Sequence, residues 1–202
     1  MASDRSKARV IEEYNLGVSF YNKGDFSNAI TQFKEAIAAD KTNERYKSAL
    51  ASAYNNRGVL VYSQKKYESA ASDFKKAFEL DTHNKQYADN LKLARETALK
   101  DKIDKLCKGA YDAFNKKEYT ESINRLKEAM KFSPQDNEIK HALAVAYNGR
   151  GVFAYSQGKF GGALEDFEMA HQIMPTQEQY KININTTREL ARRNAPKKKK
   201  KR

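Results

Sequence analysis

A block of sequence that recurs almost intact constrains this chain more than any other feature. The stretch YNNRGVLVYSQKKYESAASDFKKA, residues 54–77, returns at residues 147–170 as YNGRGVFAYSQGKFGGALEDFEMA. The glycines of the two copies, Gly58 and Gly151, lie 93 residues apart (151 − 58 = 93). A block that recurs in register indicates an internal repeat in which each copy is one packing unit.

Small residues and aromatic residues keep fixed positions in these copies and in two weaker ones. Each copy has a small residue, a second one twelve positions later, a large apolar residue four further on, and then alanine. The four sets are Gly17, Ala29, Phe33, Ala36; Gly58, Ala70, Phe74, Ala77; Ala110, Ser122, Leu126, Ala129; and Gly151, Ala163, Phe167, Ala170. Small residues let helix backbones approach, and polar breaks between them predict turns. Each copy therefore predicts two antiparallel helices joined by a tight turn.

This pattern resembles the tetratricopeptide repeat family, whose motif is W-x2-L-G-x2-Y…A-x3-F…P. Leu16-Gly17, Phe20 and Ala29-x3-Phe33 match the motif well. The second and fourth copies match it with Arg57 and Arg150 where leucine is usual. The resemblance implies an all-α solenoid of helical hairpins: four repeats in two duplicated halves, closed by a C-terminal capping helix.

The spacing between copies departs from the family's 34 residues by close to whole helical turns. Gly17 and Gly58 are 41 residues apart, and Gly58 and Ala110 are 52 apart, which exceed 34 by 7 and 18. At about 3.6 residues per turn these excesses are close to two and five turns. The extra residues therefore predict lengthened helices, including one long helix, or two nearly collinear ones, from Asn84 to Asn115.

Segment bounds follow from these copies and from the residues that favour helix ends. The first helix is expected from about Arg9, and Asp25, Thr42 or Asn43, Ser133-Pro134 and Thr176 are expected to start later helices. The predicted parts are a flexible arm at 1–8, a helical domain at 9–193 and a disordered basic tail at 194–202. The domain divides into repeats at about 10–43, 44–84, 100–135 and 137–176, with a cap at 177–193.

Composition and cysteine content indicate a non-enzymatic protein of a reducing compartment. No apolar run is long enough to cross a bilayer, and the start MASDRSKARV lacks the apolar core of a signal peptide. The single cysteine, Cys107, excludes an internal disulfide, so we expect the cytoplasm, or the nucleus in a eukaryote. His83, His141 and His171 have no zinc-ligand spacing with it, and no catalytic set is recognisable. No enzyme activity, cofactor or metal is expected.

The family resemblance implies a concave groove lined by the first helix of each repeat. Steps of three and four residues from the packed small residue place one set of side chains on that face. The expected peptide-binding residues are Tyr14, Val18, Tyr21, Asn55, Val59, Tyr62, Tyr111, Phe114, Asn148, Val152 and Tyr155. Aromatic side chains offer contact area and amides bind a peptide backbone. The alternative is that these aromatics pack as core, and Cys107, which shares the face, is expected to be an inert thiol.

The end of the sequence is strongly cationic and suggests further roles. Its six basic residues are Lys197, Lys198, Lys199, Lys200, Lys201 and Arg202, and they supply half of the net charge of +12. They resemble a nuclear import signal, and physically they form a polycation for nucleic acid, for an anionic surface, or for solubility.

The leading hypothesis is a scaffold or adaptor that binds a peptide or protein partner in the groove. The first alternative is self-assembly into a dimer or oligomer through the long helix. The second is a nucleic-acid-associated or nuclear-targeted factor that uses the tail, with help from Arg188, Arg192 and Arg193.

Overall fold

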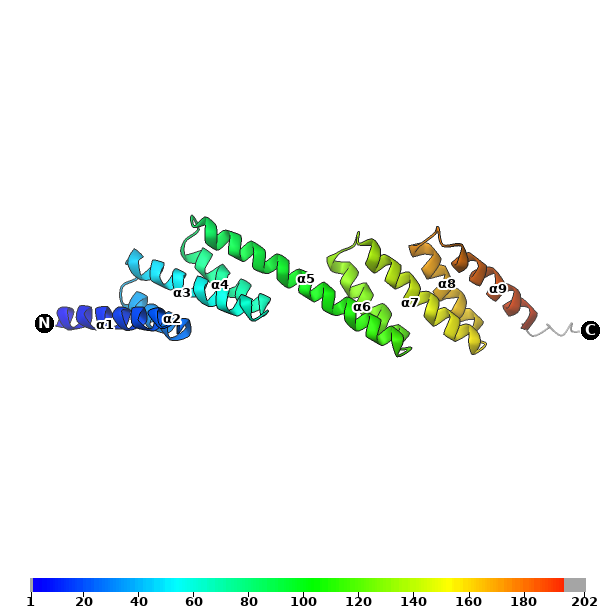
Figure 1. Cartoon of the computed structure of the whole chain (residues 1–202), viewed down its shortest axis with the longest axis horizontal. Helices are drawn as coiled ribbons and strands as arrows, with labels where there is room; N and C mark the ends of the chain where they lie inside the picture. The colour runs from blue at the N-terminus through cyan, green and yellow to red at the C-terminus, as the bar shows by residue number, and fades with distance from the viewer. Residues whose placement is uncertain (1, 195–202) are drawn as a thin grey trace, which may run out of the picture. The chain divides into compact units, whose positions relative to one another are not determined.

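The computed structural model describes the backbone of residues 2–194 and the side chains of residues 8–194. Within this part of the chain there are nine α-helices and no strand (Figure 1). The helices are α1 (Ala2–Asn22), α2 (Phe26–Ala39), α3 (Glu44–Ser63), α4 (Tyr67–Leu80), α5 (Lys85–Asn115), α6 (Tyr119–Phe132), α7 (Asn137–Ser156), α8 (Phe160–Ile173) and α9 (Glu178–Asn194). The basic residues Lys197–Arg202 lie outside the described residues. The fold is an all-α array of helical hairpins, as the sequence predicted.

The chain forms two compact units, residues 1–100 and 101–202. In the first unit, the hairpins α1–α2 and α3–α4 share a core that includes Phe33, Leu50 and Tyr54. The first half of α5 covers α4, where Leu91 and Ala94 pack with Phe74. In the second unit the other half of α5 pairs with α6, α7 pairs with α8, and α9 covers α8. Each unit is therefore two hairpins and a covering helix.

Close contact between a glycine and a phenylalanine explains the spacing of the small residues. A Cβ atom on Gly58 would lie 2.7 Å from Cε1 of Phe74, and one on Gly151 would lie 2.8 Å from Cε1 of Phe167. Real Cβ atoms do not approach so closely, so the ring occupies the space that glycine leaves. In both of these hairpins the glycine and the phenylalanine are sixteen residues apart (74 − 58, 167 − 151).

The long helices agree with the prediction from spacing, and two helix starts correct it. α3 has 20 residues and α5 has 31, so the extra residues do lengthen helices. α1 begins at Ala2, so helix continues through the segment expected to be a flexible arm. Ser133-Pro134 does not start a helix, because Ser133 ends α6 and Asp136 caps α7. The Asp136 carboxylate accepts hydrogen bonds from the backbone N–H groups of Glu138 and Ile139, which satisfies two free donors.

The arginines that replace the usual leucine hold three helices together. The Arg57 guanidinium donates two hydrogen bonds of 2.7 Å to the Asp73 carboxylate, and Arg150 does the same to Asp166 at 2.9 and 2.7 Å. The aspartates are buried, with 5% exposure each. A third nitrogen of each arginine reaches a hydroxyl on the preceding hairpin, on Ser27 or Thr120. The hydrogen bonds to Asp73 and Asp166 raise the pKa of Arg57 and Arg150 above the ordinary value, so both guanidinium groups stay charged.

None of the helices within residues 2–194 combines the length and the apolar character that a membrane span needs.

Candidate functional site

The four aromatic residues predicted along the groove, Tyr21, Tyr62, Phe114 and Tyr155, pack inside their own hairpins. Each is partly buried and meets the aromatic residue that begins the next helix, edge to face. The ring pairs and their centroid distances are Tyr21–Phe26 at 5.5 Å, Tyr62–Tyr67 at 5.1 Å, Phe114–Tyr119 at 5.4 Å and Tyr155–Phe160 at 5.6 Å. Such pairs contribute about 1 kcal/mol beyond burial. These rings therefore pack across the turns of their hairpins, and only the part of their surface that stays exposed is open to a ligand.

The polar groups predicted to bind a peptide backbone instead connect neighbouring repeats. The side-chain oxygen of Asn55 accepts a 2.8 Å hydrogen bond from Asn90, and that of Asn148 accepts one of 2.8 Å from Asn183. In the same way the hydroxyl of Tyr62 is hydrogen bonded to Thr97 at 2.9 Å. Each bond joins the first helix of one hairpin to the helix that follows the hairpin, so these groups stabilise the array.

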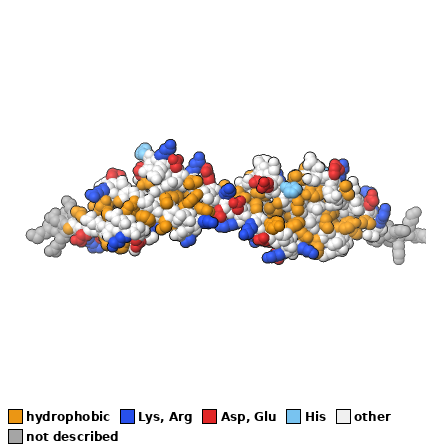
Figure 2. Space-filling model, viewed as in Figure 1, with side chains coloured by type: hydrophobic (Ala, Val, Ile, Leu, Met, Phe, Trp, Pro, Cys, Tyr) orange, Lys and Arg blue, Asp and Glu red, His pale blue; other side chains and the backbone are white. Residues whose placement is uncertain are grey.

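Other predicted residues range from buried to open. Tyr14 is buried in the core of the first unit, and Val18 is partly buried against it. Val59, Val152 and Tyr111 have 51%, 50% and 68% of their surface exposed. Hydrophobic side chains are visible on the surface of both units in Figure 2. The free apolar surface on the predicted face thus lies at these last three residues.

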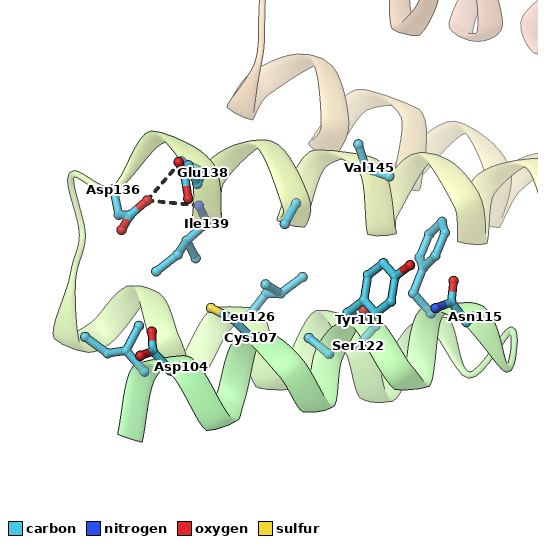
Figure 3. A pocket seen from close by; sticks show the side chains of 14 residues that line it. Asp104, Cys107, Tyr111, Asn115, Ser122, Leu126, Asp136, Glu138, Ile139 and Val145 are labelled. Atoms are coloured by element: carbon cyan, nitrogen blue, oxygen red, sulfur yellow. Dashed lines mark hydrogen bonds between the residues drawn. The ribbon is translucent and has the colours of Figure 1, made fainter. Parts of the chain in front are cut away.

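The second unit contains a pocket of about 420 Å³ between α5, α6 and α7. The α5 side of its lining includes Cys107, Tyr111 and Phe114, which sequence spacing had placed on one helix face. Leu126 of α6 and Ile139 of α7 also line it (Figure 3). Of the predicted groove residues, the structure brings Tyr111 and Phe114 together here, on the same face as Cys107.

The pocket exists because three side chains are smaller here than at the matching positions of the first unit. There, 93 residues earlier, Tyr14 lies between Phe33 and Tyr46, with ring centroids 5.6 and 4.9 Å away. The second unit has cysteine, leucine and isoleucine at these positions, namely Cys107, Leu126 and Ile139. With the same helix pairing and smaller side chains, the space that the rings fill in the first unit is left open.

One end of the pocket is acidic. Asp104, Asp136 and Glu138 gather there from α5 and from the start of α7, away from Tyr111 (Figure 3). Within residues 8–194 none of these three carboxylates forms a salt bridge, although Asp136 caps α7. The matching residues of the first unit are Ile11, Asn43 and Arg45.

Cys107 lies in this pocket as a protonated thiol. Burial is the main cause that raises its pKa, and the negative charges of Asp136, Asp104 and Glu138 add to the effect. A thiol becomes a good nucleophile when its pKa is lowered, so this environment acts against reactivity. Cys107 is therefore suited to packing against a bound group, in agreement with the inert thiol predicted from the sequence.

The acidic residues and the α7 side of the pocket were missed by the sequence reasoning. A signal was available, because most of the residues that line the pocket differ from their counterparts 93 residues earlier. Aligning the halves at the 93-residue offset would have shown two tyrosines replaced by smaller residues and an arginine replaced by a glutamate.

Comparison with known proteins agrees with this architecture. Residues 10–83 match a family model described as tetratricopeptide repeat. Residues 10–83 thus carry tetratricopeptide repeats. The second unit has the same hairpins and the same glycine–phenylalanine contact 93 residues later, so its hairpins are repeats of the same kind. A search of curated proteins found no match.

Several solved structures of tetratricopeptide repeat proteins are similar at low identity. The P58(IPK) TPR domain is 15% identical with a TM-score of 0.30, covering 92% of this chain, which spans only 57% of that one. The yeast Sti1 TPR2AB domain in its pHSP90 complex is 14% identical with a TM-score of 0.31, covering 93% and 86%. A TPR repeats protein from Bacteroides fragilis is 14% identical with a TM-score of 0.38, covering 90% and 98%. With TM-scores this low, these matches carry no further conclusion about this chain.

Proposed function

We propose that this protein is a non-catalytic scaffold that binds a peptide or an extended protein segment. The binding site is the pocket of the second unit together with the exposed apolar residues on the same face. The observation that carries the proposal is an apolar pocket of about 420 Å³ whose equivalent in the first unit is filled by the protein's own rings. This volume lies within the range of about 300–1,000 Å³ typical of ligand pockets.

The chemistry of the pocket favours binding over catalysis. Its thiol has a raised pKa, and the residues around it are mainly aliphatic and aromatic side chains that bury apolar surface. Tyr111, with 68% of its surface exposed, is placed to contact a partner at little cost to the fold. Aromatic side chains of this kind carry much of the binding energy at protein interfaces.

The test is affinity capture from the source cell with the full chain and two variants. Tyr111→Ala removes an exposed ring at the pocket, and Met169→Ala is a control on α8, where 37% of the methionine is exposed. We expect Tyr111→Ala to lose a defined set of captured proteins that Met169→Ala retains, while circular dichroism shows both folded. Capture of the same proteins in the same amounts by Tyr111→Ala would contradict the proposal.

The two alternatives from the sequence remain predictions. The basic tail lies outside the described residues, and the site described here gives no particular support to self-assembly.

A further inference from the structure

The pocket of the second unit has an apolar part, lined by Cys107, Leu126 and Ile139, and a negatively charged end. We propose that it binds a protein segment in which a large apolar side chain stands next to a lysine or arginine. The apolar side chain enters between Cys107 and Ile139, and the cation meets Asp104, Asp136 and Glu138. This inference rests on the proposed function and names the chemistry of the partner.

The first unit supports the apolar half of this assignment. At the matching place it holds the rings of Tyr14 and Tyr46, which are tilted by 33° and have centroids 4.9 Å apart. The helix backbones there already accommodate side chains of that size. In the second unit a ring or a branched aliphatic group from another chain is suited to fill the same space, with burial of its apolar surface as the driving force.

The first unit also supports the cationic half. The guanidinium of Arg45 lies 4.9 Å from the centre of the Tyr14 ring, and its Nε donates a 3.1 Å hydrogen bond to the Tyr14 hydroxyl. The first unit therefore supplies both the ring and the cation from its own sequence. The second unit has Glu138 where Arg45 would be, so the position that holds a positive charge in one unit is negative in the other.

The carboxylates at the acidic end are available to a partner. Asp104 and Glu138 are exposed, and within residues 8–194 neither forms a salt bridge. Asp136 uses Oδ1 to cap α7, and within residues 8–194 its Oδ2 accepts no hydrogen bond. Exposed ion pairs contribute little individually, so the charges set the choice of partner while the apolar side chain supplies most of the affinity.

The experiment selects peptides from a library of capped random hexapeptides with the full chain. Affinities of the selected peptides are then measured by fluorescence anisotropy, and alkylation of Cys107, the single cysteine, reports whether the pocket is occupied. The double variant Asp104→Asn/Glu138→Gln removes two charges without changing shape and leaves the Asp136 cap in place. Its matched control, Asp112→Asn/Glu128→Gln, removes two exposed acids of the same unit outside the pocket.

We expect the selected peptides to carry lysine or arginine within two residues of an aromatic, leucine or isoleucine side chain. The charge variant should weaken them about threefold to tenfold, as expected for two exposed ion pairs, and the control variant less than twofold. Cys107→Tyr, which refills the pocket as in the first unit, should weaken them more than tenfold. Bound peptide should slow the alkylation of Cys107. The peptide APKKKKKR, residues 195–202 of this chain, provides cations without a large apolar group and should bind at least tenfold more weakly.

The outcomes separate the two proposals. Peptides that protect Cys107 but show no cationic preference, or that bind the charge variant unchanged, would overturn this inference and leave the proposed function standing. Equal binding of APKKKKKR would also overturn it. Selection of no peptide that protects Cys107 would overturn both. Should Cys107→Tyr fail to fold, the isosteric charge variant still decides the result.

Discussion

The two units of this protein pair their helices in the same way, but they carry different side chains on the first helices of their hairpins. In both, an arginine–aspartate pair and an asparagine–asparagine hydrogen bond join neighbouring helices at matching positions with nearly the same distances. On the face of the first helices the units diverge. The first unit packs Tyr14, Tyr46 and Arg45 together, and the second leaves a pocket with an acidic end.

This difference distinguishes residues that stabilise the contacts between repeats from residues that leave a pocket open. A residue between helices contacts side chains on two or three elements, so a change there disturbs close packing. Three buried positions differ all the same: the second unit has smaller side chains where the first has Tyr14, Phe33 and Tyr46, and it keeps the same helix pairing while leaving a pocket. In a duplicated protein of this kind, the positions where the copies disagree are the ones to examine for binding.

The first test replaces the two tyrosines that fill the first unit with the smaller residues that the second unit has at these positions. Tyr14→Cys/Tyr46→Ile removes two packed rings and the hydroxyl that binds Arg45, and it leaves a cavity in the core. We expect the free energy of unfolding of the first unit to fall by about 3–5 kcal/mol, as for other large-to-small core changes.

Urea denaturation measures this loss, with Ile11→Ala, a change at a side chain with 53% exposure, as the control. A loss below about 1 kcal/mol for the double variant would mean that the rings do not support the first unit, since core truncations of this size cost more.

A second test addresses the arginine–aspartate pairs that both units contain. Arg57→Leu and Arg150→Leu restore the leucine usual in the family but leave Asp73 or Asp166 buried without its partner. Because the arginines themselves are partly exposed, we expect each change to cost about 2 kcal/mol, below the cost for a fully buried pair.

Thermal or urea unfolding should show the two losses to be similar, since both pairs have the same geometry. Replacing the aspartate as well, in Arg57→Leu/Asp73→Leu, should recover most of the loss, because no unpaired charge remains. If the arginine variants are as stable as the wild type, the arginine–aspartate pairs do not stabilise the packing of the helices.

A third test changes a glycine that only the second unit has, and we expect it to alter the free energy of unfolding the least. Gly162 lies in the first turn of α8, where the first unit has Ser69, and a Cβ atom there would meet nothing within 4 Å. Gly162→Ala should therefore raise the free energy of unfolding by about 0.5 kcal/mol through better helix propensity.

Gly151→Ala is the matched contrast, because its Cβ atom would lie 2.8 Å from Cε1 of Phe167. It should lower the melting temperature where Gly162→Ala raises it. A rise for both would mean that the glycine–phenylalanine contact does not require glycine.

Much of the fold was predictable because local spacing decides it. The long helix expected over Asn84–Asn115 spans Lys85–Asn115. The cap at Asp136 was missed because Ser133 and Pro134 also favour helix starts, and only the hydrogen bonds decide between them.

The candidate site was less predictable. Helical spacing placed Tyr62 on the expected face, but it did not reveal that its ring packs on Tyr67 across the turn. Periodicity assigns a residue to a side of a helix, and it does not say how much of that side the next helix covers.

The order of residues alone was enough to predict that this chain is a duplicated array of helical hairpins. The recurring small and large apolar residues sufficed, because two helices pack closely where a small residue on one meets a large apolar side chain on the other. The position of the open pocket in the second unit followed only from how its helices pack. Asp104 and Asp136 are 32 residues apart in the sequence (136 − 104), and they reach the same pocket because α5 and α7 pack on either side of it.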